Sequence, residues 1–239
     1  MSVEPYPLPR RRRCYLVRHG HVDYFDSQGR PLDPRSVCLS RSGAQQAWAL
    51  SQALLDTPID RALCSDYPRA LQTLDLLLVG RGISAEPNAA LREIRAGRLR
   101  EIPAEAMHGQ VVDAYRNAGR EGAQFLGGER WDDFRQRVLG AFFELVADPC
   151  WDSALIVSHD AVNRILLSWA TGAGLAGIAA FEQDTACLNI LDIDTCGQQV
   201  QGAILRTVNF TPYNPQKTGI HDTVMENLYR DIQPAGPRA

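Results

Sequence analysis

Two short runs of consecutive apolar residues constrain the fold of this chain more than any other feature. The first is Cys14-Tyr15-Leu16-Val17 and the second is Ala154-Leu155-Ile156-Val157. Continuous apolar runs of this length are typical of strands that are buried on both faces of a sheet. Polar residues that include a histidine follow each run directly. We therefore expect two interior strands that each carry a histidine to the same edge of one sheet.

Apolar residues recur at helical spacing between these runs. Segments with this spacing begin near Ser40, Arg69 and Trp131, and another follows the second run. The clearest helical stripe consists of Trp131, Phe134, Val138, Phe142 and Leu145. Further strands are expected at 61–64 and near 187–193 and 202–209. This alternation predicts an α/β fold, a three-layer α/β/α sandwich around a mainly parallel (mixed) central sheet.

The 239 residues fit one large domain, and a chain of this length can bury a core without metal or disulfide support. We expect an irregular N-terminal arm over residues 1–13 and a single domain over residues 14–210. Residues 211–239 are polar and contain prolines, which predicts a C-terminal tail packed on or draped over the domain. This tail is expected either to cover the site or to form a subunit contact. A second copy of the chain, in a homodimer, is therefore one expected partner.

Charge and composition exclude several classes of partner. The net charge of −3 provides no basic field for nucleic acid or for an anionic membrane, and no apolar window has the length of a membrane span. The arginine run 10–13 is expected to be solvated. The six cysteines lack metal-ligand spacing, which predicts reduced thiols and a cytoplasmic protein.

Basic and imidazole side chains follow three of the expected strands. Arg18 and His19 follow the first apolar run, His159 follows the second, and Arg69 begins the helix after the strand at 61–64. The carboxyl ends of these strands meet at one crevice in an α/β sheet. A neutral imidazole attacks phosphorus well, while guanidinium groups hold the phosphoryl oxygens in the transition state. The pattern therefore predicts phosphoryl transfer.

An ordered set of motifs resembles the histidine phosphatase superfamily, the phosphoglycerate mutase-like proteins of branch 1. The set spans about residues 14–170 and consists of Leu16-Val17-Arg18-His19-Gly20, Leu39-Ser40-x-x-Gly43-x-x-Gln46-Ala47, Ser65-x-x-x-Arg69-Ala70-x-Gln72-Thr73, Leu91-Arg92-Glu93-x-x-x-Gly97, Gly127-Gly128-Glu129 and Val157-Ser158-His159.

The resemblance implies a role for each matched residue. His19 would be the nucleophile that becomes phosphorylated, and Arg18, Arg69 and His159 would hold the phosphoryl oxygens. Glu93 would protonate the leaving alkoxide and later activate water.

Other residues receive expected roles beside these. In the acid phosphatase branch of the superfamily, an aspartate at the place of Asp160 is the proton donor, so Asp160 competes with Glu93, which we favour. His21, Asp160 and Arg95 are further expected substrate contacts. Glu93 has a structural alternative, a surface ion pair with a neighbouring arginine. The arginines at 92, 95, 98 and 100 favour a mouth that accepts a second anionic group.

We therefore expect a metal-independent phosphatase of a small phosphorylated metabolite that works through a phosphohistidine and uses no cofactor. His21 and Asp23 have metal-like spacing, but two such residues in a loop favour a solvated face. One alternative is a phosphoglycerate-type phosphomutase, and another is a non-catalytic binding module. Mutases of the resembling family carry a tryptophan in the segment after the first histidine motif, and residues 27–33 contain none.

Overall fold

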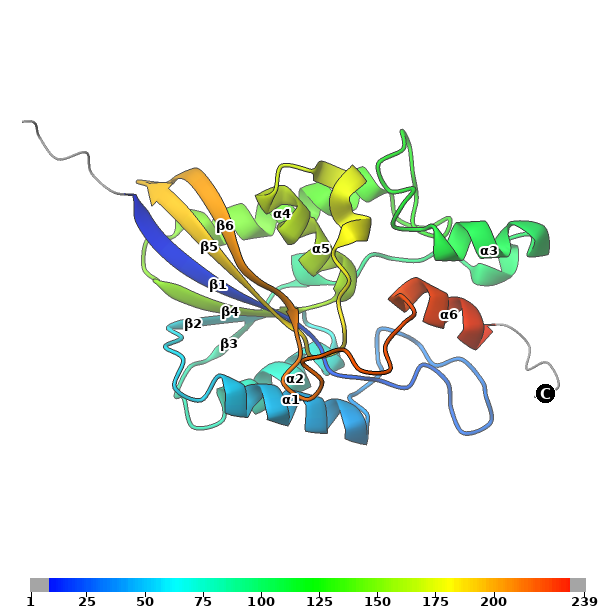
Figure 1. Ribbon diagram of the computed structural model, residues 1–239, viewed down its shortest axis with the longest axis horizontal. Coiled ribbons are helices and arrows are strands. Elements are labelled where there is room, and N and C mark those ends of the chain that lie inside the picture. The colour runs from blue at the N-terminus through cyan, green and yellow to red at the C-terminus, as the bar shows by residue number, and fades with distance from the viewer. Residues whose placement is uncertain (1–8, 233–239) are drawn as a thin grey trace, which may run out of the picture.

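The two apolar runs form adjacent interior strands of a six-stranded sheet in the computed structural model, which describes residues 9–232 (Figure 1). The strand order is β3-β2-β4-β1-β5-β6. The first four strands in this order are parallel to one another. Strand β5 is antiparallel to β1, and β6 is antiparallel to β5. The strands are β1 (Arg10–Arg18), β2 (Arg61–Cys64), β3 (Ala85–Pro87), β4 (Ser153–Ser158), β5 (Leu188–Cys196) and β6 (Gln199–Phe210). The predicted mixed sheet is confirmed.

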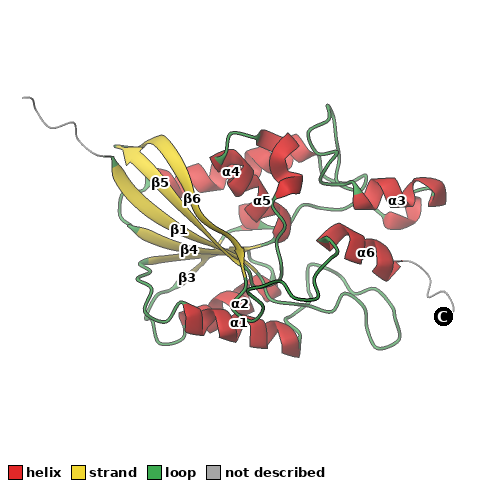
Figure 2. Cartoon of the chain, viewed as in Figure 1, coloured by secondary structure: helices red, strands yellow, loops and turns green. Residues whose placement is uncertain are grey.

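Helices cover both faces of the sheet and complete the three layers (Figure 2). One face is covered by α1 (Arg41–Ala53) and α2 (Pro68–Leu78), and the other by α4 (Trp131–Ala147) and α5 (Asp160–Ala170). Two smaller helices, α3 (Ala104–Val112) and α6 (Val224–Ile232), pack against each other at one end of the molecule (Figure 1). Three short 3₁₀ turns lie at η1 (Ala89–Leu91), η2 (Leu99–Glu101) and η3 (Gly174–Ala180).

The apolar periodicity of the helices explains where they pack. The five residues of the predicted α4 stripe are all buried, and they belong to the same core cluster as residues of β1, β4 and α5. On the opposite face, Leu50 and Leu54 of the α1 segment pack against Leu74 of α2 and against the interior strands. Ser40 caps α1 as predicted, because its side chain accepts a hydrogen bond from the Gly43 amide.

The prediction of an irregular arm was wrong for residues 10–13, which form the first half of β1. Arg12 is buried, and its guanidinium donates to the carbonyls of Val146 and Asp148 at the end of α4 while stacking on Trp151 at 4.3 Å. Alternate arginines pair instead with aspartates on β5. A run of four cations is solvated in isolation, but here each one has a partner that is distant in sequence. Residues 1–8 of the expected arm lie outside the described residues.

The segment after β6 packs on the domain and contains a helix that the sequence did not predict. Lys217 donates to the Asp184 carboxylate at 2.6 Å, which fastens this segment to the loop before β5. In α6, Met225 is buried, and Leu228, Tyr229 and Ile232 lie against the main core. Residues 233–239 of the expected tail lie outside the described residues. Within residues 9–232, no helix combines the length and the apolarity that crossing a membrane requires.

Candidate active site

Parallel pairing of three strands brings the two predicted histidines together at one edge of the sheet. His19 follows β1 and His159 follows β4, which is the neighbouring strand. The two imidazole rings lie edge to face with 5.1 Å between their centroids. His19 is only 2 % exposed and His159 is fully buried, so neither ring is a surface side chain.

Arg69 joins the two histidines. It lies in the first turn of α2, directly after Pro68, and is 2 % exposed. Its Nε donates to Nε2 of His19 at 3.0 Å, and its Nη2 donates to Nδ1 of His159 at 3.2 Å. Its remaining nitrogen, Nη1, donates to the Pro34 carbonyl. One planar guanidinium therefore fixes both rings at the same time.

The hydrogen bonds determine which ring nitrogens carry protons. Nδ1 of His19 faces the Gly20 carbonyl at 2.7 Å, and because a carbonyl only accepts, this nitrogen carries the proton. The Nε2 lone pair of His19 consequently points to Arg69 and into the site. Burial, then Arg69 and Arg18, hold the pKa of His19 well below its usual range. Burial and Arg69 also lower the pKa of His159, whose Nε2 lies 2.8 Å from the Ser65 hydroxyl. Both rings are neutral near pH 7.

Two glycines allow the loop after β1 to pass close to the start of α1. A Cβ on Gly20 would overlap the Gly43 carbonyl, and a Cβ on Gly43 would overlap the backbone of His21. Side chains from the sequence motifs hold this loop in place. The Gln46 side chain accepts from the His21 amide at 2.9 Å. Thr73 of α2 accepts from the Gly20 amide at 3.1 Å. The motif residues therefore fix the backbone directly after His19.

Arg18 supplies the second guanidinium of the site. Its Nη1 donates to the Gln183 carbonyl at 2.5 Å, which ties it to the loop before β5. Its Nε is buried and has no hydrogen-bond partner among residues 9–232. A buried donor of this kind, with no protein partner in the described structure, is suited to an anionic oxygen.

Glu93 lies in the loop after η1 and faces the first turn of α5. Its Oε1 accepts from the Ile94 amide at 3.0 Å, and its Oε2 from the Ala161 amide at 3.4 Å. Burial, and then the neighbouring Asp160 carboxylate, raise the pKa of Glu93 to about 7. A carboxyl group with this pKa exists in both protonation states near neutral pH, as a group that first donates and later accepts a proton requires.

Asp160 lies in a different environment, although it is adjacent to His159. Its Oδ1 accepts from Nε of Arg164 at 2.6 Å, and its Oδ2 from the Tyr115 hydroxyl at 2.9 Å. Arg164 is itself buried and also donates to Glu182 at 2.8 Å. Both carboxylate oxygens of Asp160 therefore already accept from side chains of the chain itself, so its geometry is less suited to a proton donor than that of Glu93.

The remaining expected contacts lie further from the two imidazoles. His21 is partly exposed, and its Nδ1 lies 2.9 Å from the Ser40 hydroxyl, which accounts for one of its ring nitrogens. The Arg95 side chain is 78 % exposed and lies 3.6 Å from the Glu129 carboxylate. Among the residues that the structure describes, no three His, Cys, Asp or Glu side chains gather in a way that could hold a metal ion.

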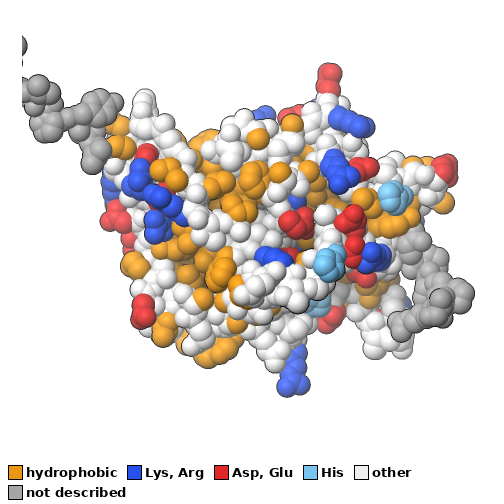
Figure 3. Space-filling model, viewed as in Figure 1, with side chains coloured by type: hydrophobic (Ala, Val, Ile, Leu, Met, Phe, Trp, Pro, Cys, Tyr) orange, Lys and Arg blue, Asp and Glu red, His pale blue; other side chains and the backbone are white. Residues whose placement is uncertain are grey.

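Three of the four arginines expected at the mouth have acidic partners, and Arg100 makes no ion pair within residues 9–232. Arg92 makes a bidentate pair with Asp66 at 2.6 and 2.7 Å. Arg98 pairs with Glu101 at 3.3 Å. Acidic and basic side chains are correspondingly interspersed on the visible face of the molecule (Figure 3). The positive charge expected at the mouth is therefore largely balanced by carboxylates.

Three residues near the histidines received no role from the sequence. Ser65 contacts His159, and it occupies the first position of the matched arginine motif, so a signal was present. Tyr67 packs edge-on against His159 with 5.4 Å between ring centroids, and the Arg69 guanidinium lies over the Tyr67 ring. Gln183 comes from a loop with no recognisable pattern, and only the tertiary fold brings its carbonyl to Arg18.

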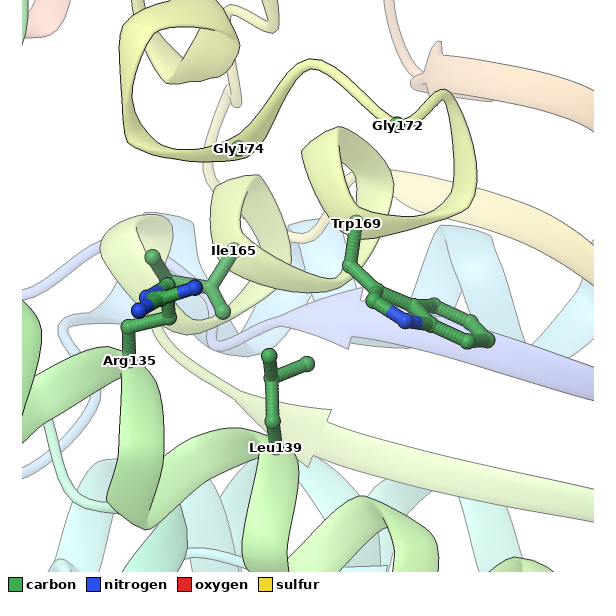
Figure 4. Close-up of a pocket in the computed structure, with 6 residues that line it drawn as sticks. All are labelled: Arg135, Leu139, Ile165, Trp169, Gly172 and Gly174. Carbon is green, nitrogen blue, oxygen red and sulfur yellow. The ribbon is translucent and has the colours of Figure 1, made fainter. Parts of the chain in front are cut away.

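A separate apolar cavity lies on the helical layer that α4 and α5 form, away from the histidines (Figure 4). It has a volume of about 140 Å³ and is lined by Arg135, Leu139, Ile165, Trp169, Gly172 and Gly174. It contains one charged side chain and no imidazole, carboxyl or thiol group. The cavity therefore does not belong to the candidate active site.

Comparison with known proteins identifies the family of this chain. The histidine phosphatase superfamily (branch 1) model matches residues 14–204. The adenosylcobalamin/alpha-ribazole phosphatase of Salmonella typhimurium is 27% identical over 183 residues, which are 76% of this chain and 90% of that protein. A probable phosphoglycerate mutase of Erwinia tasmaniensis is 27% identical over 163 residues, which are 67% of this chain and 75% of that protein.

Solved structures show the same fold. A mycobacterial glucosyl-3-phosphoglycerate phosphatase superposes with a TM-score of 0.70 at 25% identity, covering 84% of this chain and 99% of that one. The alpha-ribazole phosphatase of Shigella flexneri gives a TM-score of 0.67 at 26% identity, covering 82% and 96%. The chain therefore belongs to branch 1 of the histidine phosphatase superfamily, and as an enzyme it falls in the class of the phosphoric monoester hydrolases.

Proposed function

We propose that this enzyme hydrolyses a small phosphomonoester through a phosphohistidine formed on His19, without a metal ion. The observation that carries the proposal is the position of the Nε2 lone pair of His19. It is unprotonated, faces the site, and lies beside two guanidinium groups that suit phosphoryl oxygens. These are the requirements for nucleophilic attack on phosphorus.

In the first step, Nε2 of His19 attacks phosphorus and the bond to the ester oxygen breaks. The Arg69 N–H that now reaches Nε2 turns to a phosphoryl oxygen, and Arg18 Nε supplies a second donor. The proton of Glu93 moves to the leaving oxygen, so the product leaves as an alcohol rather than as an alkoxide.

In the second step, water enters the position of the alcohol. The Glu93 carboxylate takes a proton from this water, whose oxygen attacks phosphorus. The N–P bond breaks, its electron pair returns to Nε2 of His19, and inorganic phosphate leaves. Glu93 regains its proton, and its pKa of about 7 supports both directions of transfer.

The surroundings of the site favour hydrolysis over transfer to a second hydroxyl of a phosphoglycerate. A mutase must hold the carboxylate of its substrate as well as the phosphoryl group. Arg92, Arg95 and Arg98 all lie against carboxylates of the chain itself. The relatives named above include a probable mutase, so product analysis must separate the two reactions.

Trapping the phosphoenzyme tests the proposal. Brief exposure to a ³²P-labelled phosphomonoester, followed by denaturation, should give a labelled protein whose label is lost in acid and retained in alkali. The label should be absent in His19→Ala. His221→Ala is the control, because it removes an exposed histidine that has no role in the site, and it should retain the label. A label that persists in His19→Ala would overturn the proposal.

The substrate is best identified with a panel of phosphorylated metabolites. Two of the proteins named above are an adenosylcobalamin/alpha-ribazole phosphatase and a glucosyl-3-phosphoglycerate phosphatase, so alpha-ribazole phosphate and glucosyl-3-phosphoglycerate belong in the panel beside sugar phosphates, nucleotides and phosphoamino acids. Release of inorganic phosphate supports hydrolysis. An isomerised phosphoester with no free phosphate would support the mutase instead.

A further inference from the structure

The turn before α4 holds a carboxylate that has no part in the proposed chemistry. The Glu129 side chain is 6 % exposed, and both of its oxygens accept from Nη2 of Arg137 at 3.1 Å. Its Oε2 also accepts from the Arg95 amide at 3.0 Å. A buried carboxylate is costly unless it is paired, so Glu129 and Arg137 form one structural unit.

The other end of the Arg137 guanidinium reaches the backbone that carries Glu93. Its Nη1 donates to the Ala90 carbonyl at 2.8 Å and to the Arg92 carbonyl at 3.0 Å. The Arg92 carbonyl belongs to the peptide group that joins Arg92 to Glu93. A single planar group therefore grips the chain directly before the proposed acid.

Backbone contacts hold the same loop on the other side of Glu93. The Glu129 amide donates to the Arg95 carbonyl at 2.8 Å. A Cβ on Gly128 would overlap the backbone at 95–97, and a Cβ on Gly97 would overlap the backbone of Leu126 and Gly127. The glycine turn and the loop that bears Glu93 are thus packed backbone to backbone, with Arg137 closing the remaining side.

We propose that Arg137, oriented by Glu129, is a positioning residue for the general acid. It holds the peptide before Glu93 so that the carboxyl group lies at the leaving oxygen. This inference rests on the proposed function, because it presupposes that Glu93 is the proton donor. Arg137 does not touch His19, Arg18 or Arg69 through any hydrogen bond in the described structure, so its loss should affect the acid and spare the nucleophile.

Leaving-group dependence provides the readout. An alkyl phosphate needs a proton on its leaving oxygen, whereas p-nitrophenyl phosphate has a stable leaving anion and needs little help. The measured quantity is kcat/KM, which reports only the steps up to the phosphoenzyme. For Arg137→Met we expect a fall of about 10- to 100-fold with the alkyl ester, which is the scale of a misplaced catalytic group. With p-nitrophenyl phosphate we expect a fall of less than about threefold, since the nucleophile stays in place.

Two further variants make the result specific. Arg135→Met is the matched control, because Arg135 lies on the same helix, has a side chain that is 46 % exposed and makes no hydrogen bond to the loop of Glu93 in the described structure; it should leave both rates unchanged. Arg137→Lys keeps the charge opposite Glu129 but cannot span two carbonyls and a carboxylate. It should therefore show the same selective loss in smaller measure, and it provides the test if Arg137→Met does not fold.

The inference and the proposed function fail in different ways. Glu93→Gln should itself lose far more rate with the alkyl ester than with p-nitrophenyl phosphate. Equal losses in Glu93→Gln would remove Glu93 as the acid and would overturn the proposed function. A selective loss in Glu93→Gln, combined with equal losses or none in the folded Arg137 variants, would overturn only the positioning role of Arg137.

Discussion

Replacing Asp160 with asparagine should move the alkaline limb of the pH–rate profile to lower pH. The limb of kcat/KM reports the loss of the proton from Glu93, whose pKa is raised to about 7 by burial first and by the Asp160 charge second. Asparagine keeps the shape of the side chain and removes the charge. The Arg164 guanidinium then has one anionic partner fewer, which lowers the pKa of Glu93 further in the same direction.

The size of the effect follows from the two pKa values. At pH 7 a carboxyl group with a pKa of 7 is about half protonated, whereas one at the ordinary 4.5 is about 0.3 % protonated. Burial is the larger of the two causes, so we assign about one pH unit of the difference to Asp160. On the falling limb at pH 8, Asp160→Asn should therefore be about tenfold slower than the wild type. At pH 5 the two should be equal.

The assay is kcat/KM for an alkyl phosphate between pH 5 and 9, with variant and wild type compared at each pH so that ionisation of the substrate cancels. Removing one partner of a buried ion pair costs about 3–5 kcal/mol of stability, so thermal unfolding must show a folded variant throughout this range. Tyr115→Phe is the control, because it deletes one hydrogen bond to Asp160 and keeps the charge, and it should not move the limb to lower pH. A folded Asp160→Asn with the wild-type limb would refute the electrostatic argument.

Four other outcomes are expected. Activity should be unchanged in EDTA, and a loss that a divalent cation restores would contradict the metal-independent mechanism. Glu93→Gln should raise the free energy of unfolding at pH 8 by about 3 kcal/mol and hardly at pH 4.5, because a carboxyl group whose pKa is raised in the folded state destabilises the fold as pH rises from 4.5 through about 7; chemical denaturation at both pH values measures this. Gly43→Ala should abolish phosphoenzyme formation, since its Cβ would overlap the His21 backbone beside the nucleophile; labelling as in the wild type would contradict this. Arg12→Ala should lower the free energy of unfolding by about 2–4 kcal/mol, whereas Arg11→Ala, which removes an exposed ion pair, should have a much smaller effect; equal losses would show that the contact with α4 is unimportant.

The sequence predicted the parts of the fold that depend on local patterns. Apolar runs identify β1 and β4, and helical spacing identifies α4, because burial on two faces or on one stripe is visible in consecutive residues. It did not predict β3, which has only three residues and contains a proline. The helix α6 was also missed, since a single nine-residue segment near the end of the chain has little context.

For the site, the strand ends indicated which residues come together, but not how their charges are balanced. The sequence identified Arg18, Arg69 and both histidines as candidates. Only the folded chain shows that Asp160 and Arg164 form a buried pair. It also shows that Arg12, which was expected in solvent, donates to a carbonyl at the C-terminus of α4. Arg12 and the α4 carbonyls are far apart in the chain, so a single sequence carries no information about that contact. Asp160 and Arg164 are four residues apart on α5, a spacing that is visible in the sequence, but the burial of the pair is not.

The place of β1 in the sheet has a consequence for how the enzyme is made. This strand is near the N-terminus, yet it lies between β4 and β5, so that Leu16 is paired with Ile156 on one side and with Asn189 on the other. During synthesis, the strand that bears the nucleophile has no neighbour until most of the chain has left the ribosome. Pairings of such high sequence separation form slowly, because a long loop must close before any contact offsets its entropy. A growing chain therefore carries His19 long before the fold can place His159 beside it.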